Sequence, residues 1–189
     1  MLTWSTPSFF ILEYPSAQCA FTADPFHIPP LPSEDCLLLA QVTDPEAEAA
    51  LQILAEHLGS RLLVPEVWRD ILPQTGLLIP AAISGGFLED RLKRAAEASP
   101  GRCWLLADRF RMYFPLPCPS GSGRFLSALD AERLRAGGPD FYSPEFCCRY
   151  CYDYSNGLVL FDTEDSISEK LRLAKEAGFH GALLQTTLT

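Results

Sequence analysis

Residues 148–185 read CRYCYDYSNGLVLFDTEDSISEKLRLAKEAGFHGALLQ, and this stretch decides the fold class. Two short apolar segments flank a turn at 155–157, which predicts two strands joined by that turn. A helix is expected from about Asp165 to Ala177, with Gly178 at its end and a closing strand at 181–185. The order strand, turn, strand, helix, strand is typical of the closing edge of a β/α structure.

The helix in this stretch has the clearest boundaries of any element. Ser166 and Glu169 have the spacing of a capping box. Leucine, isoleucine and alanine side chains recur at helical spacing and predict an apolar side that packs on a sheet. Lys170 and Lys175 are expected on the polar side, which would face water.

The preceding residues continue the alternation of strands and helices. Asp44 or Thr43 is expected to cap a helix that begins at Pro45 and ends at Gly59. Further strands are expected at 9–14, 36–42, 61–68, 77–83 and 103–117, and further helices at 87–98 and 127–135. This alternation predicts an α/β fold with mostly parallel strands, a small or incomplete TIM-like (β/α) barrel that forms a single domain over residues 1–189.

Composition and charge exclude several classes of partner. The formal net charge of −9 disfavours nucleic acid and anionic membranes. No apolar run has the roughly 18 residues of a spanning helix, and no signal peptide is recognised, so a cytoplasmic location is expected. The seven cysteines are odd in number, which argues against a disulfide scaffold. Cys147, Cys148 and Cys151 are interpreted as buried thiols, and neither a metal nor a cofactor is expected.

From about residue 102 to 186 the order of features resembles the chitinase-like glycoside hydrolases of family 18, in the branch of the spore-cortex and spore-germination glycosidases. The matching segments are Cys103–Tyr113, Phe114–Pro117, Arg149-Tyr150, Asn156-Gly157, Leu158–Asp162, Ser166–Lys170 and Gly181–Gln185. The resemblance covers slightly less than half of the chain. It implies a barrel in which Tyr113 faces a ligand pocket.

The chain departs from that family at the residues that would carry the reaction. The family's Asp-x-x-Asp-x-Asp-x-Glu motif, whose Glu protonates the glycosidic oxygen, has no counterpart. Phe114 stands where an Asp is expected, and Gln185 stands where a Trp would form the floor of the sugar site. The resemblance therefore implies a degenerate, non-catalytic barrel that binds a carbohydrate or a protein partner.

Two alternatives remain open. An enzyme that acts on N-acetylglucosamine-containing glycans would need a relocated acid, and Glu66 beside Trp68 is the candidate, because an aromatic ring can stack on a sugar and raise the pKa of a neighbouring acid. Glu13 and Asp108 join Trp68, Tyr113 and Gln185 as candidate ligand-binding residues, since Glu13 lies at the end of the first expected strand and Asp108 lies on the strand expected at 103–117. The other alternative is a structural or oligomerising protein without a small-molecule site, whose mark would be an exposed apolar patch in the aromatic segment 142–154.

Overall fold

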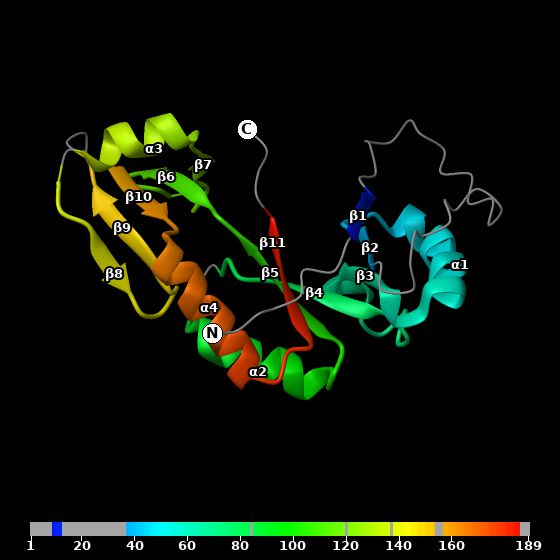
Figure 1. Ribbon diagram of the computed structural model, residues 1–189. Helices are drawn as coiled ribbons and strands as arrows, with labels where there is room; N and C mark the ends of the chain where they lie inside the picture. Colours follow the sequence, from blue (N-terminus) through cyan, green and yellow to red (C-terminus); the bar gives the residue numbers. More distant parts are fainter. Residues whose placement is uncertain are drawn as a thin grey trace. The chain divides into compact units, whose positions relative to one another are not determined.

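Short apolar segments separated by polar turns build a mixed α/β fold (Figure 1). The computed structural model describes residues 9–12, 37–83, 85–119, 121–136, 138–153 and 157–185, and only the backbone of residues 9–12, 108 and 185. Within these ranges the strands are β1 (Phe9–Leu12), β2 (Leu37–Ala40), β3 (Leu62–Pro65), β4 (Gly76–Pro80), β5 (Cys103–Asp108), β6 (Arg111–Pro115), β7 (Arg124–Phe125), β8 (Phe141–Ser143), β9 (Cys148–Tyr152), β10 (Gly157–Phe161) and β11 (Gly181–Gln185). The helices are α1 (Glu48–Leu58), α2 (Leu88–Ala98), α3 (Ala128–Arg135) and α4 (Glu164–Glu176).

The strands form two sheets of different kinds. The first has the order β1-β2-β3-β4-β5-β11, and its β1–β2, β2–β3 and β3–β4 pairs are parallel. Strands β2 and β3 are short apolar runs with both faces buried, which is typical of parallel sheets. This sheet confirms the expected partial TIM-like barrel. The second sheet has the order β7-β6-β10-β9-β8 and is antiparallel, so the expectation of mostly parallel strands holds for the first sheet only.

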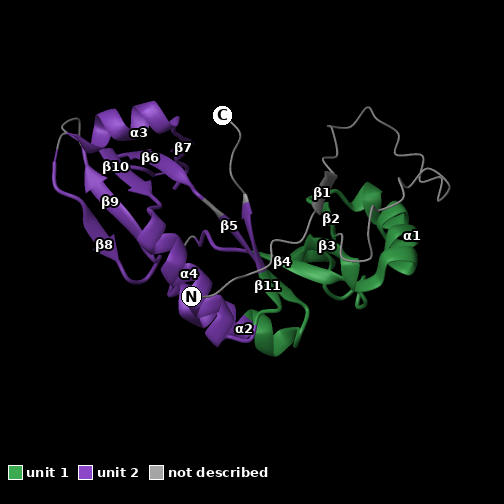
Figure 2. Cartoon of the chain, viewed as in Figure 1, with its two compact units in different colours: residues 1–79, 95–104, 179–181 green, residues 80–94, 105–178, 182–189 purple. Residues whose placement is uncertain are grey.

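The chain divides into two compact units (Figure 2). Unit 1 comprises residues 1–79, 95–104 and 179–181, and unit 2 comprises residues 80–94, 105–178 and 182–189. Strands β5 and β11 contribute residues to both units. The single domain expected over residues 1–189 stays a prediction.

In unit 1 the helix signals of the sequence are confirmed. The side chain of Asp44 accepts a hydrogen bond from the backbone N–H of Glu46, and Pro45 begins a 3-10 turn that leads into α1. Gly59 ends α1 with a φ of 55°, a left-handed value that glycine adopts without strain. The core of the unit consists of side chains from α1 and the parallel strands, among them Leu51, Leu54, Leu62, Leu63, Val64, Leu77 and Ile79.

In unit 2, α3 packs against one face of the antiparallel sheet (Figure 1). The buried residues between them are Leu126, Ala131, Cys151, Val159 and Phe161. Burial alternates along strand β10. Gly157, Val159 and Phe161 alternate with Leu158 and Leu160, and only the first set lies in the core.

Several expected boundaries were wrong. The strands expected at 36–42 and 77–83 end at Ala40 and Pro80. The strand expected at 61–68 ends at Pro65, and residues 66–68 form a 3-10 helix. The strand expected at 103–117 is two strands, because β6 pairs with β10 in the antiparallel sheet while β5 stays in the first sheet. The capping box of α4 consists of Thr163 and Ser166 rather than Ser166 and Glu169, because the helix begins one turn earlier than that pairing requires.

Candidate functional site

One face of the antiparallel sheet is lined by apolar side chains across all five strands. Cross-strand partners project from the same face of a sheet, so the register shows which side chains lie together. One row across the strands consists of Phe125, Met112, Leu160, Tyr150 and Phe141. A second row consists of Phe114, Leu158 and Tyr152. We call these eight residues the aromatic face.

The rings of the aromatic face are accessible. Phe125, Tyr152 and Phe141 are 78%, 55% and 44% exposed, and the remaining five side chains are half-buried. The Phe141 and Tyr150 rings are stacked with centroids 5.4 Å apart, and the Tyr152 ring meets Tyr150 edge-on at 6.0 Å. Because the water-facing side of an antiparallel sheet is normally polar, an uncharged face of this kind indicates a binding surface.

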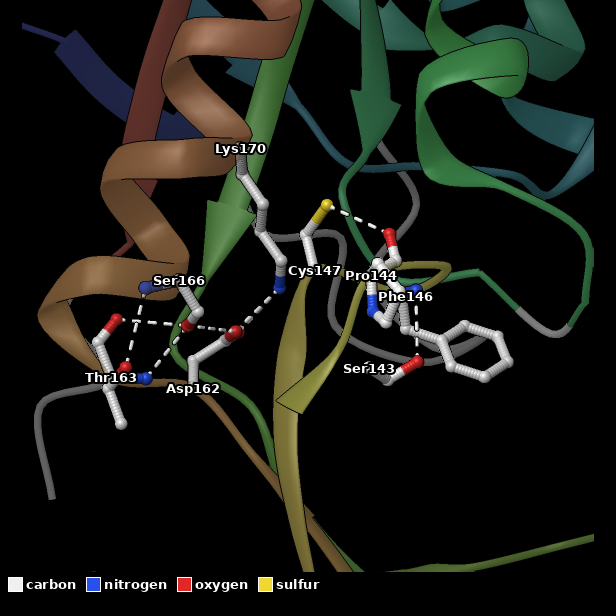
Figure 3. A network of polar contacts seen from close by, with 8 residues as sticks. All are labelled: Ser143, Pro144, Phe146, Cys147, Asp162, Thr163, Ser166 and Lys170. Atoms are coloured by element: carbon white, nitrogen blue, oxygen red, sulfur yellow. Dashed lines mark hydrogen bonds and ion pairs between the residues drawn. The ribbon is translucent and has the colours of Figure 1, made fainter. Parts of the chain in front are cut away.

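Unit 2 also contains a buried ion pair (Figure 3). Lys170 Nζ lies 2.7 and 2.8 Å from the two carboxylate oxygens of Asp162, and both side chains are fully buried. Ser166 Oγ donates to Asp162 Oδ1 at 2.8 Å, and the Lys170 ammonium lies over the Phe110 ring at 4.7 Å. The expectation that Lys170 faces water was therefore wrong, since Asp162 supplies a charge partner inside the protein. This network joins β10 to α4 and has no access for a ligand.

The three clustered cysteines are buried thiols. Cys148 and Cys151 are fully buried in β9, and Cys147 occupies the preceding turn with a φ of 49°. Burial raises the pKa of Cys148 to about 11 and also raises the pKa of Cys147 and of Cys151. Thiols that stay protonated are poor nucleophiles and poor metal ligands. Among the described residues, no group of three or more His, Cys, Asp or Glu side chains could hold a metal ion.

Glu66 and Trp68 share one short 3-10 helix in unit 1 but have different surroundings. Trp68 is 3% exposed, and its Nε1 donates to the carbonyl of Val42 at 2.5 Å. A ring in this position belongs to the core and offers no face on which a sugar could stack. Glu66 is partly exposed and lies 3.8 Å from Arg69 Nη1, one turn along the chain.

Tyr113, the residue carried over from the family resemblance, lies in β6 of unit 2. Its ring packs against the core beneath α3 and against Gly157, with the guanidinium of Arg124 over it at 4.9 Å. It therefore faces away from the aromatic face. Glu13 lies outside the described residues. Asp108 ends β5 and Gln185 ends β11, and the structure describes only the backbone of both.

The aromatic face was largely missed by sequence reasoning. The sequence indicates the segment 142–154 as a source of an apolar patch. It does not indicate that apolar residues of β10, β6 and β7 share a face with Tyr150 and Tyr152. A signal was present, because apolar residues occupy both parities of β10 where a one-sided sheet would alternate with polar ones. Among the described residues, no helix has the length and apolar character needed to cross a membrane.

Comparison with known proteins finds similarity in structure but not in sequence. No protein-family model matches the chain, and no curated protein matches it. The spore cortex-lytic enzyme SleL of Bacillus cereus has 16% identity and a TM-score of 0.54, over 79% of this chain and 44% of that one. The chain thus spans less than half the length of SleL.

Two further structures have a comparable likeness. A GH18 chitinase of Cycas revoluta, in complex with (GlcNAc)3, has 15% identity and a TM-score of 0.51, over 79% of this chain and 62% of that one. Human YKL-39 has 11% identity and a TM-score of 0.56, over 78% of this chain and 61% of that one. The chain therefore has the fold of part of a GH18 barrel and resembles the chitinase-like and spore-cortex proteins of that family.

Proposed function

We propose that this protein is a non-catalytic relative of the glycoside-hydrolase barrels that binds a carbohydrate on the aromatic face of unit 2. The observation that carries the proposal is the group of accessible rings formed by Phe141, Tyr150 and Tyr152. Aromatic rings bind the apolar faces of sugars through the same quadrupole and surface burial that favour ring pairs. None of the eight side chains carries a charge, which suits a neutral ligand.

Two further points support a binding role. The acidic motif that would protonate a glycosidic oxygen is absent from the sequence, and catalysis needs an acid within reach of that oxygen. Among the structures of similar fold, YKL-39 is described as a pseudo-chitinase with retained chitooligosaccharide binding properties. A fold of this kind can thus keep sugar binding after losing the reaction. The described cysteines are free, which suits the reducing cytoplasm that we include in the proposal.

Binding of chitohexaose, measured by calorimetry and by NMR titration, tests the proposal. Tyr150→Ala and Tyr152→Ala are each expected to weaken binding about tenfold, the loss of one ring contact of roughly 1.4 kcal/mol. Leu129→Ala is the matched control, because Leu129 is 56% exposed on α3, which covers the opposite side of the sheet. Wild-type binding that both tyrosine variants retain in full would place the sugar site elsewhere.

The enzyme alternative is tested separately through Glu66. Glu66→Gln keeps the shape of the side chain and removes the acid, so it should abolish any turnover of chitooligosaccharide or muropeptide without lowering the melting temperature. Turnover that this variant leaves unchanged would exclude Glu66 as the acid.

The aliphatic part of the aromatic face favours a second candidate, a homo-oligomer. Met112, Leu158 and Leu160 lie between the rings and could be covered by another protein surface. Light scattering over a concentration series distinguishes the two functions. A dimer that Leu160→Ser dissociates, together with no binding of any glycan, would replace the carbohydrate proposal.

A further inference from the structure

The opposite face of the antiparallel sheet gathers arginine side chains around one buried ring. Phe161 is 1% exposed and has two direct cross-strand partners, Arg111 on β6 and Arg149 on β9. Side chains that are directly opposite across a strand pair have Cβ atoms about 4.5–5.5 Å apart. Arg111 and Arg149 therefore rise from the sheet on the two sides of the Phe161 ring.

A third arginine covers the same ring from the helix side. The guanidinium carbon of Arg135, in the last turn of α3, lies 4.1 Å from the Phe161 ring centroid. Arg135 Nη2 is held by Asp140 at 3.0 Å, whereas its Nε is buried without a hydrogen-bond partner. Stacking and the ion pair fix the guanidinium in place, which reduces the entropy that it would lose on binding a ligand.

The positive charges of this cluster are only partly neutralised. Asp140 pairs with Arg135, but no carboxylate among the described residues pairs with Arg111 or Arg149, which are both half-buried. The whole chain carries a net charge of −9, so this concentration of unpaired cations is local. Like charges held close together destabilise the folded state, and an anion placed between them would relieve that cost.

An open depression of about 410 Å³ lies beside Arg135 and is lined by Glu132, Arg135, Ala136, Gly138 and Asp140. Glu132 and Asp140 make its outer wall acidic, which disfavours an anion approaching that wall. Arg111 and Arg149 belong to strands β6 and β9, and no acidic residue is a cross-strand partner of Arg111, Phe161 or Arg149.

We propose that Arg111, Arg135 and Arg149 form a binding site for an oxyanion group, a phosphate or a carboxylate, in which stacking on the Phe161 ring positions the guanidinium of Arg135. Arginine forks present paired N–H donors that match the oxygens of both groups. The site is separate from the aromatic face, since the two lie on opposite faces of one sheet, and the inference does not rest on the proposed carbohydrate binding.

Titration with sodium phosphate and with sodium succinate, at constant ionic strength in chloride buffer, tests the site. Binding is followed by the NMR shifts of the arginine Nε–H groups and by melting temperature. Arg111→Gln with Arg149→Gln is expected to weaken the binding of phosphate or succinate at least tenfold. Arg133→Ala, on the same helix but 70% exposed and near Asp130, is the matched control and should bind as the wild type does.

The melting temperature without the anion supplies an independent outcome. Because the double variant removes two unpaired cations, it should be at least as stable as the wild type in low-salt chloride. Stronger binding of phosphate than of succinate would assign the site to phosphate groups, and the reverse would assign it to carboxylates. Equal responses of wild type and double variant to both anions, or no response in the wild type, would overturn the proposal.

Discussion

Replacing Lys170 with methionine tests whether the ion pair between Asp162 and Lys170 is shielded from water, as its geometry indicates. The ammonium contacts both oxygens of Asp162, and neither side chain is exposed. In Lys170→Met the Asp162 carboxylate keeps the hydroxyl of Ser166 but loses its charge partner. Breaking a buried pair in this way costs about 3–5 kcal/mol, because an uncompensated charge remains inside the protein.

The expected fall in melting temperature follows from this free-energy cost. For a chain of 189 residues, 1 kcal/mol corresponds to roughly 2–4 °C in melting temperature, so a fall of about 6–20 °C is expected. In the double variant, Asp162→Asn with Lys170→Met, no charge is buried. Its stability should therefore exceed that of either single variant, since removing both charges of a buried pair is often close to neutral.

Urea denaturation followed by far-UV circular dichroism measures these differences. With a slope of about 2 kcal/mol/M, the midpoint of Lys170→Met should fall by roughly 1.5–2.5 M. Arg172→Ala, two residues further along α4, is the control. Arg172 bridges Glu169 and Glu176 in water, where salt screens the pairs, and its loss should leave the midpoint near that of the wild type. A Lys170→Met midpoint within roughly 0.5 M of the wild-type midpoint would refute the conclusion that the ion pair is shielded from water.

Three further predictions concern other parts of the chain. Burial raises the pKa of Cys148 from 9.0 to about 11, so the unfolded chain loses this proton at a lower pH than the folded protein does. The free energy of unfolding should therefore fall as the pH rises from about 9 to about 11. Urea midpoints across this range should show a smaller fall for Cys148→Ala and an unchanged fall for the control Cys118→Ala. A Cβ at Gly157 would overlap the ring of Tyr113, so Gly157→Ala should lower stability by about 1–3 kcal/mol, and by less when Tyr113 is already alanine; equal costs in both backgrounds would contradict the contact. Trp68 and Trp104 lie in unit 1, so the single domain predicted for residues 1–189 requires the tryptophan emission and the far-UV signal to change at the same urea concentration. Separate transitions would show that the units unfold independently.

The local signals of the sequence predicted much of the first sheet and its helices. Asp44, Pro45 and Gly59 mark the ends of the first helical segment because each acts on backbone groups only a few residues away. The same locality explains the error at α4. Thr163 and Ser166 satisfy the same capping geometry as the predicted Ser166 and Glu169, and only the position of the preceding strand selects between them.

The candidate site was less predictable, because its residues meet through strand pairing. Tyr150 and Tyr152 lie within eleven residues of Leu158 and Leu160, but Met112, Phe114 and Phe125 join them from β6 and β7. Nothing in residues 103–117 indicates that the second half leaves the parallel sheet and pairs with β10. Trp68 shows the converse case, since an aromatic that looked suited to a ligand is placed in the core by its bond to Val42.

By itself, the sequence determined the element types, the caps and the likeness to part of a glycosidase barrel, because these depend on neighbouring residues and on the order of motifs. The tertiary structure alone decided which face of each strand is buried and which distant side chains share a surface. Lys170 illustrates the reason: helical spacing assigned it to water, and only the arrival of Asp162 and Phe110 beside it made burial of its charge tolerable. The aromatic face and the arginine cluster arise in the same way, from the register of strands that are distant in the chain.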